Sequence, residues 1–84
     1  MKELELGKRY ALKDSNQEHT QTVVFSTSED STGTSTSEVL NVLIEKLYAD
    51  QFRQFSCERA TAIEFLKAAR RILTKNSLKN RSNE

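Results

Sequence analysis

Two stretches with apolar residues at three- and four-residue spacing constrain the fold of this chain more than any other feature. They read TSEVLNVLIEKLYADQF and CERATAIEFLKAARRILTKN, and only the segment RQFS separates them. Such spacing is the signature of helices that bury one face. A short connection makes consecutive helices run antiparallel. The sequence therefore predicts an antiparallel helical hairpin over residues 35–76.

Capping residues set the predicted ends of both helices. Ser35 and Glu38 have the spacing of a capping box, in which each side chain satisfies a free amide of the first turn. Ser56 has the same role as the expected N-cap of the second helix. Asn76 is expected to end that helix, so that residues 77–84 form a frayed basic tail.

Each predicted helix has an apolar face that we expect to be buried. In the first helix this face comprises Val39, Leu40, Leu43, Ile44 and Leu47, widened by Val42. In the second helix the stripe comprises Ala62, Phe65, Leu66, Ala69, Ile72 and Leu73. At the turn between them, Cys57 is expected to be a small buried residue, and Phe55 is expected to belong to the core. The sequence leaves Phe52 evenly balanced between core and exposure.

The N-terminal third predicts a short β-hairpin followed by a loop. Alternation with period two over residues 2–12, interrupted at Gly7, predicts one strand. The β-branched run of residues 20–27 predicts a second strand, and the Ser/Thr-rich residues 26–34 predict a solvated loop. The expected fold class is therefore α+β, with a short N-terminal β-hairpin followed by an antiparallel two-helix hairpin.

The size of the chain favours a single small domain that self-associates. It has 84 residues, which we interpret as one domain over residues 1–84 with a β-rich part at residues 1–27. A chain of this size buries only about 60% of the surface that its unfolded form exposes. Small domains usually recover stability through disulfides, metal or oligomerisation. Cys57 is the only cysteine and His19 the only histidine, so the sequence predicts a homo-oligomer.

Composition argues against an enzyme and against a membrane protein. His19 and Cys57 have no sequence cue that places them together, and neither glycine lies in a phosphate-binding loop. We therefore expect no catalytic residues, no metal and no cofactor. No stretch approaches the roughly 20 apolar residues of a membrane span, and a single thiol suits a reducing cytoplasm. The formal net charge is only +1, which argues against DNA as a partner.

Binding chemistry is better represented, first at the turn of the hairpin. Arg59 lies in the first turn of the second helix, where backbone amides are free, and Phe52 and Arg53 lie close by in the chain. A guanidinium, an aromatic face and helix-start amides together suit a small phosphorylated ligand that carries a base.

A second candidate group lies at the basic end of the second helix. Lys75, Lys79 and Arg81 either complement the helix dipole or form an anion site that several chains complete around a symmetry axis. Tyr10, on the first predicted strand, completes the set of candidate ligand-binding residues.

Several segments together resemble the phage sponge proteins, which include anti-CBASS and anti-Thoeris proteins with a helical hairpin domain. They are VVF, a turn-rich loop with a glycine, SEVLNVLIEKL, a turn that contains phenylalanine, FSCER, and AIEFLKAARRIL with a basic tail. The resemblance covers residues 22–81. It implies a small homo-oligomer, often a hexamer, that binds cyclic oligonucleotide or cyclic ADP-ribose-type messengers without cleaving them.

The resemblance assigns the turn residues Phe52, Arg53 and Arg59 to one ligand-contacting region and the basic tail to another. The chain departs from the family pattern at Asn76 and Asn80, where arginines are expected, and these departures favour a cyclic dinucleotide. The function expected from the resemblance is sequestration of this messenger in the cytoplasm of an infected cell, which blocks CBASS effectors. The alternative is a phage interaction module that binds a host protein through its helical hairpin.

Overall fold

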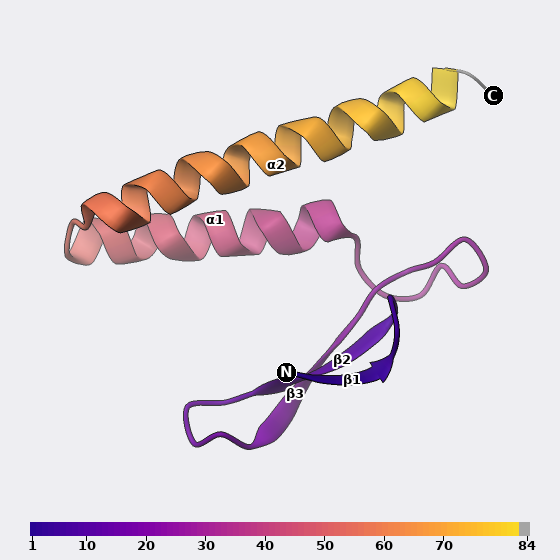
Figure 1. The fold of residues 1–84 in the computed structure, drawn as a ribbon, viewed down its shortest axis with the longest axis horizontal. Coiled ribbons are helices and arrows are strands. Elements are labelled where there is room, and N and C mark those ends of the chain that lie inside the picture. Colours follow the sequence, from indigo (N-terminus) through magenta and orange to yellow (C-terminus); the bar gives the residue numbers. More distant parts are fainter. Residues whose placement is uncertain (83–84) are drawn as a thin grey trace. The chain divides into compact units, whose positions relative to one another are not determined.

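The computed structural model describes the backbone of residues 1–82 and the side chains of residues 1–75. Its elements in chain order are β1 (Lys2–Glu5), β2 (Arg9–Lys13), β3 (His19–Val24), α1 (Thr36–Arg53) and α2 (Cys57–Ser82) (Figure 1). The chain divides into two compact units, Met1–Thr36 and the helical part from Ser37 onward. The expected α+β class, with strands before helices, is confirmed. Within the described helices, no segment is long and apolar enough to span a bilayer.

The N-terminal unit holds three antiparallel strands in the order β1-β2-β3. The predicted two-stranded hairpin is therefore wrong, because the first predicted strand splits into β1 and β2 at Gly7. The Lys8 amide donates to the Glu5 carbonyl at 3.0 Å, and Gly7 has a φ of 76°. A four-residue turn with positive φ at its third position favours glycine. What the sequence showed as an interruption is thus a complete chain reversal.

Asp14 organises the turn between β2 and β3. Its Oδ1 accepts from the amides of Asn16 at 2.8 Å and Glu18 at 3.0 Å, while its Oδ2 accepts from the Thr20 hydroxyl at 3.1 Å. The Glu18 amide, followed by the Asn16 amide and the Thr20 hydroxyl, lowers the pKa of Asp14. An aspartate that binds nearby backbone in this way fixes a turn. This is the turn that the predicted strands at residues 2–12 and 20–27 require between them.

The loop after β3 folds back onto the strand that precedes it. The Thr34 amide donates to the Val24 carbonyl, and the Ser26 amide donates to the Thr34 carbonyl, both at 2.8 Å. Asp30, in this loop, forms an ion pair of 2.8 Å with Lys8, the residue that precedes β2. The Lys8 ammonium and then the Thr32 hydroxyl lower the pKa of Asp30 far below its ordinary value. The predicted loop is present, and it is hydrogen-bonded to the sheet.

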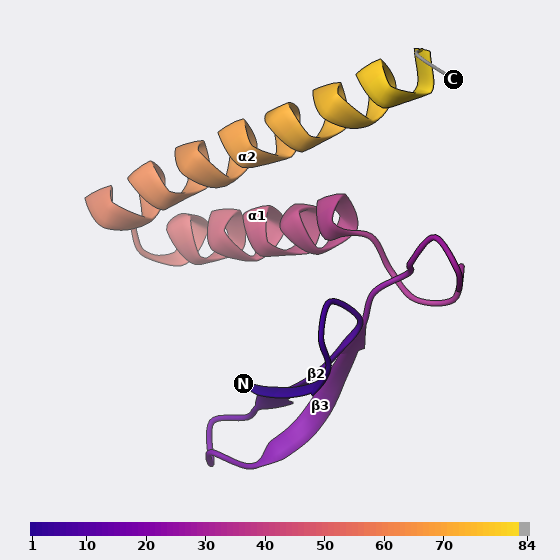
Figure 2. The same cartoon turned by 45° about the vertical axis from the view of Figure 1, so that its right-hand side comes forward.

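The helical unit is an antiparallel hairpin, as predicted. α1 begins at Thr36, directly after the expected N-cap Ser35. α1 and α2 lie side by side in both ribbon views (Figures 1 and 2). α2 does not end at Asn76 as the sequence predicted, because its backbone remains helical to Ser82. Since α2 is the longer helix, its C-terminal part continues past the start of α1.

The seam of the hairpin centres on one residue from each helix. Ile44 of α1 is 4% exposed and Ile63 of α2 is 3% exposed. Ile44 belongs to the predicted face of the first helix, whereas Ile63 was not part of the predicted stripe. Within that stripe, Leu66 is half-buried but Phe65 is 72% exposed. The face that α2 turns toward α1 therefore lies beside the predicted stripe and overlaps it only in part.

Several side chains that were expected inside the hairpin lie at its surface. Cys57 is exposed, and Phe55 is 69% exposed, so both predictions of burial are wrong. The evenly balanced Phe52 is 95% exposed. Other apolar side chains of the helical unit that remain exposed are Val42, Leu43, Ile72 and Leu73. The hairpin thus shows far more apolar surface than its own seam covers.

We expect Gly33→Ala to destabilise the N-terminal unit more than Gly7→Ala does. Both glycines have positive φ, so each variant carries a backbone cost of about 1–2 kcal/mol. A Cβ on Gly33 would also lie 2.7 Å from the Val24 carbonyl oxygen, whereas a Cβ on Gly7 meets nothing within 4 Å. Denaturation followed through the amide NMR signals of β2 and β3 measures the difference. Equal losses in the two variants would contradict this prediction.

Ile63→Ala should lower the free energy of unfolding of the helical unit by about 2–5 kcal/mol, as large-to-small core substitutions do. Phe65→Ala, two residues along the same helix, should cost much less in dilute protein because Phe65 is exposed. Urea unfolding monitored by circular dichroism compares the two variants. If Phe65→Ala lowered the free energy of unfolding as much as Ile63→Ala does, Ile63 would not be the centre of the contact between the helices.

Candidate functional site

The first predicted site residue at the turn, Arg59, is used to close the hairpin. Its Nη1 donates to the side-chain oxygen of Gln51 at 2.9 Å and to the carbonyl of Gln54 at 2.6 Å. Its backbone amide donates to the Oγ of Ser56 at 3.2 Å, which confirms Ser56 as the N-cap of α2. A half-buried guanidinium with these bonds holds the end of α1 against the start of α2. Arg59 therefore has a structural role in this chain.

The other two turn residues, Phe52 and Arg53, project from the end of α1. Both side chains are exposed, and the Nη2 of Arg53 lies 3.7 Å from Asp50. Asp50 also accepts a hydrogen bond from Lys46, which lowers the pKa of Asp50. The carboxylate thus neutralises part of the positive charge at the turn. Phe52 and Arg53 have the chemistry of a ligand contact, but neither lines the cavity at Tyr10 or the two hollows beside α2 that are described below.

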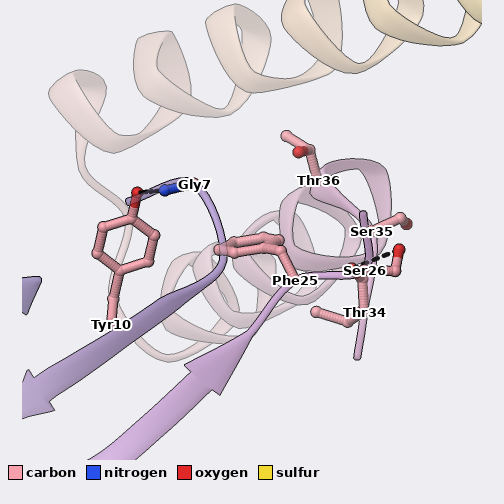
Figure 3. Close-up of a pocket in the computed structure, with 7 residues that line it drawn as sticks. All are labelled: Gly7, Tyr10, Phe25, Ser26, Thr34, Ser35 and Thr36. Carbon is pink, nitrogen blue, oxygen red and sulfur yellow. Dashed lines mark hydrogen bonds between the residues drawn. The ribbon is translucent and has the colours of Figure 1, made fainter. Parts of the chain in front are cut away.

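Tyr10 lines a cavity of about 410 Å³ in the N-terminal unit (Figure 3). Its ring meets that of Phe25 edge to face, with 6.3 Å between centroids, and its hydroxyl oxygen accepts from the Gly7 amide. The rest of the lining is hydroxyl-bearing, from Ser26, Thr34, Ser35 and Thr36. This uncharged lining suits an uncharged polar group and offers nothing to balance a phosphate.

Four cationic side chains gather on one face of α2. Lys67, Arg70, Arg71 and Lys75 recur at helical spacing, and together with Thr74 they line a hollow of about 410 Å³. Residues at this spacing share a face, and eight residues of helix rise roughly 12 Å. We call these four residues, Lys67, Arg70, Arg71 and Lys75, the basic face of α2. It contains the predicted site residue Lys75.

A second hollow, of about 500 Å³, runs along the seam beside the basic face. We call it the seam groove. It is lined by Glu38, Asn41, Ile44, Glu45 and Tyr48 of α1 and by Lys67 and Arg70 of α2. The two hollows therefore meet at Lys67 and Arg70. All charged residues that line the first hollow are cations, whereas the seam groove also carries an aromatic ring and carboxylates.

Two hydrogen bonds between the helices fix this arrangement. The Nη1 of Arg70 donates to the Oδ1 of Asn41 at 2.7 Å, and the Nζ of Lys67 donates to the Tyr48 hydroxyl at 3.4 Å. The Tyr48 bond, followed by the nearby charge of Glu64, raises the pKa of Lys67. Lys67 is therefore fully charged at neutral pH. Arg70 is oriented by Asn41, which leaves part of its guanidinium fork for a ligand.

The structure separates the residues that the sequence proposed for binding. Phe52 and Arg53 lie at the end of α1 and Arg59 at the start of α2, Lys75 lies far along α2, and Tyr10 belongs to the N-terminal unit. The side chains of Lys79 and Arg81 lie outside the described residues. Of the cations that line the two hollows, the sequence predicted only Lys75 as a site residue, and it did not predict Asn41, Glu45 or Tyr48. No local signal marks these three, because only the register of α1 on α2 brings them to the cations.

Within the described residues, no group of three or more histidine, cysteine, aspartate or glutamate side chains is arranged to hold a metal ion. Comparison with protein-family models, with curated proteins and with solved structures finds no match for the chain.

Arg59→Ala should lower the free energy of unfolding of the hairpin by about 1–3 kcal/mol, because charged hydrogen bonds to Gln51 and Gln54 are lost. Arg53→Ala is the matched control at the same turn. Its exposed pair with Asp50 should contribute less than roughly 1 kcal/mol. Urea denaturation of both variants measures the effect. No loss in Arg59→Ala, or an equal loss in Arg53→Ala, would contradict a structural role for Arg59.

Proposed function

We propose that this protein is a phage anti-defence sponge that binds a cyclic dinucleotide and holds it without hydrolysing it. It acts as a homo-oligomer in the cytoplasm of the infected cell and thereby keeps CBASS effectors inactive. The observation that carries the proposal is the basic face of α2, which meets the seam groove at Lys67 and Arg70. The resemblance of residues 22–81 to phage sponge proteins supports the same function.

The chemistry of the basic face suits the two phosphodiesters of a cyclic dinucleotide. Arg70 and Arg71 offer planar guanidinium forks, which bind phosphate oxygens in pairs. Lys67 and Lys75 add mobile point charges at either end of the same face. The last carboxylate of α2 before this face is Glu64, whose Oε1 lies 3.6 Å from the Nζ of Lys67. The electrostatic potential over the rest of the basic face is therefore positive and favours the binding of a ligand with two negative charges.

Tight sequestration requires more contacts than one chain provides. Nanomolar affinity corresponds to about 12 kcal/mol, and charged hydrogen bonds contribute roughly 1.5–3 kcal/mol each. A homo-oligomer brings several copies of the basic face near one another. The exposed apolar side chains of the helical unit, among them Val42, Phe65 and Ile72, support such assembly. Large exposed apolar patches usually mark interaction surfaces.

The same apolar surface favours one alternative, a phage interaction module that binds a host protein through the helical hairpin. The two functions differ in what covers the surface. A sponge self-associates when purified alone, and sedimentation then gives a mass of several chains. An interaction module stays monomeric until its host protein is added, and it binds no cyclic dinucleotide.

Isothermal titration of the protein with a panel of cyclic dinucleotides tests the proposal directly. At least one member of the panel should bind with submicromolar affinity. After heat denaturation of the complex, the released ligand should have its original mass and chromatographic mobility. Absence of heat for every ligand would refute binding, and a cleaved product would refute sequestration.

Arg71→Gln should weaken this binding by about ten- to a hundredfold, because a phosphate loses a charged hydrogen bond of roughly 1.5–3 kcal/mol. The matched control is Lys13→Gln, which removes the same charge from an exposed position on β2. Lys13→Gln should leave the affinity within twofold of the wild type. Equal affinities of Arg71→Gln and wild type would remove the basic face from the binding site.

A further inference from the structure

The α1 side of the seam groove carries functional groups that a phosphate site does not need. Asn41, Glu45 and Tyr48 recur at helical spacing and face the same hollow as Lys67 and Arg70. A site built only for phosphate would exclude a carboxylate, because the two anions repel each other. The position of Glu45 beside the cations therefore requires another explanation.

The carboxylate of Glu45 is a hydrogen-bond acceptor that makes no contact stabilising the described part of the fold. Its neighbour Asn41 is engaged by Arg70 at 2.7 Å, but the Glu45 side chain has no hydrogen bond or ion pair with any residue that the structure describes. Its side chain is exposed on the wall of the groove. Both carboxylate oxygens are therefore available to donors on a ligand.

Tyr48 supplies an aromatic surface one turn farther along α1. Its hydroxyl accepts from Lys67, while the side chain as a whole remains 48% exposed. Stacking on an aromatic ring binds nucleobases with little sequence preference, because every base has a π-face. Tyr48 can therefore give affinity for a base, and the carboxylate of Glu45 decides which base edge is accepted.

A carboxylate presents two acceptor oxygens side by side, and its complement is a pair of adjacent N–H donors. Guanine has this pair at N1 and at its exocyclic amino group. Adenine and cytosine each place one amino donor beside a ring-nitrogen acceptor, and uracil flanks its one N–H with two carbonyls. Unpaired or opposed polar groups in a binding site strongly disfavour the wrong ligand.

We propose that the seam groove selects guanine, with Glu45 as the specificity-determining residue and Tyr48 as the stacking surface. The base would lie in the seam groove and its phosphate on the basic face, since the two hollows share Lys67 and Arg70. This inference rests on the proposed function and narrows its ligand to cyclic dinucleotides that contain guanine.

Titration of the full chain with cyclic di-GMP and with cyclic di-AMP tests the selectivity. The wild type should bind cyclic di-GMP at least tenfold more tightly than cyclic di-AMP. Glu45→Gln should lose at least tenfold for cyclic di-GMP and stay within twofold for cyclic di-AMP, because an amide offers one acceptor and one donor. Glutamine and glutamate have similar helix propensities, so circular dichroism should show an unchanged fold.

The matched control is Glu29→Gln, which removes the same charge from an exposed position in the N-terminal unit. It should leave the affinities for both ligands within twofold of the wild type. Equal binding of the two ligands by the wild type, or equal losses for both in Glu45→Gln, overturns guanine selection and leaves the proposed function standing. Failure of every cyclic dinucleotide to bind overturns both.

Discussion

The closed turn between the helices is the constraint on which the rest of the helical unit depends. Gln51 bridges the turn in both directions: its Nε2 donates to the Ser56 carbonyl at 3.1 Å, and its Oε1 accepts from the Ser56 amide at 2.9 Å. Arg59 binds the same Oε1 from the other helix. This cluster sets the register of α2 on α1, and the register brings Asn41 opposite Arg70 and Tyr48 opposite Lys67. The candidate site is a consequence of this register.

Much of the fold follows from local sequence patterns. Helical spacing and the caps Ser35 and Ser56 placed both helix starts, because these signals depend only on neighbouring residues. The sequence predicts a single strand where β1 and β2 lie, because the alternation of apolar and polar side chains continues across the turn at Gly7. The predicted buried stripe of α2 is displaced from the observed one because apolar residues cover a wide arc of this helix. Ile63 and Phe65 both lie within that arc, and only Ile63 is buried. Periodicity shows that a helix has an apolar face, but the partner helix decides which part of it is buried.

The candidate site was less predictable than the fold. Lys75 was recognised because cations cluster in sequence at the end of α2. Arg59 was expected to contact ligand, yet the turn uses its guanidinium, and nothing in the local sequence reveals the carbonyl of Gln54 as its partner. Glu45 and Tyr48 lie 19 to 25 residues before Lys67 and Arg70 in the chain, and their relation depends on contacts across the hairpin. Residues of this kind become visible only when the helices are paired.

Native mass spectrometry of the protein mixed with a cyclic dinucleotide that contains guanine tests the central claim most directly. Sequestration by a homo-oligomer predicts an assembly of several chains that carries ligand of unaltered mass. A single chain without ligand, or an assembly that carries a cleaved nucleotide, would contradict it.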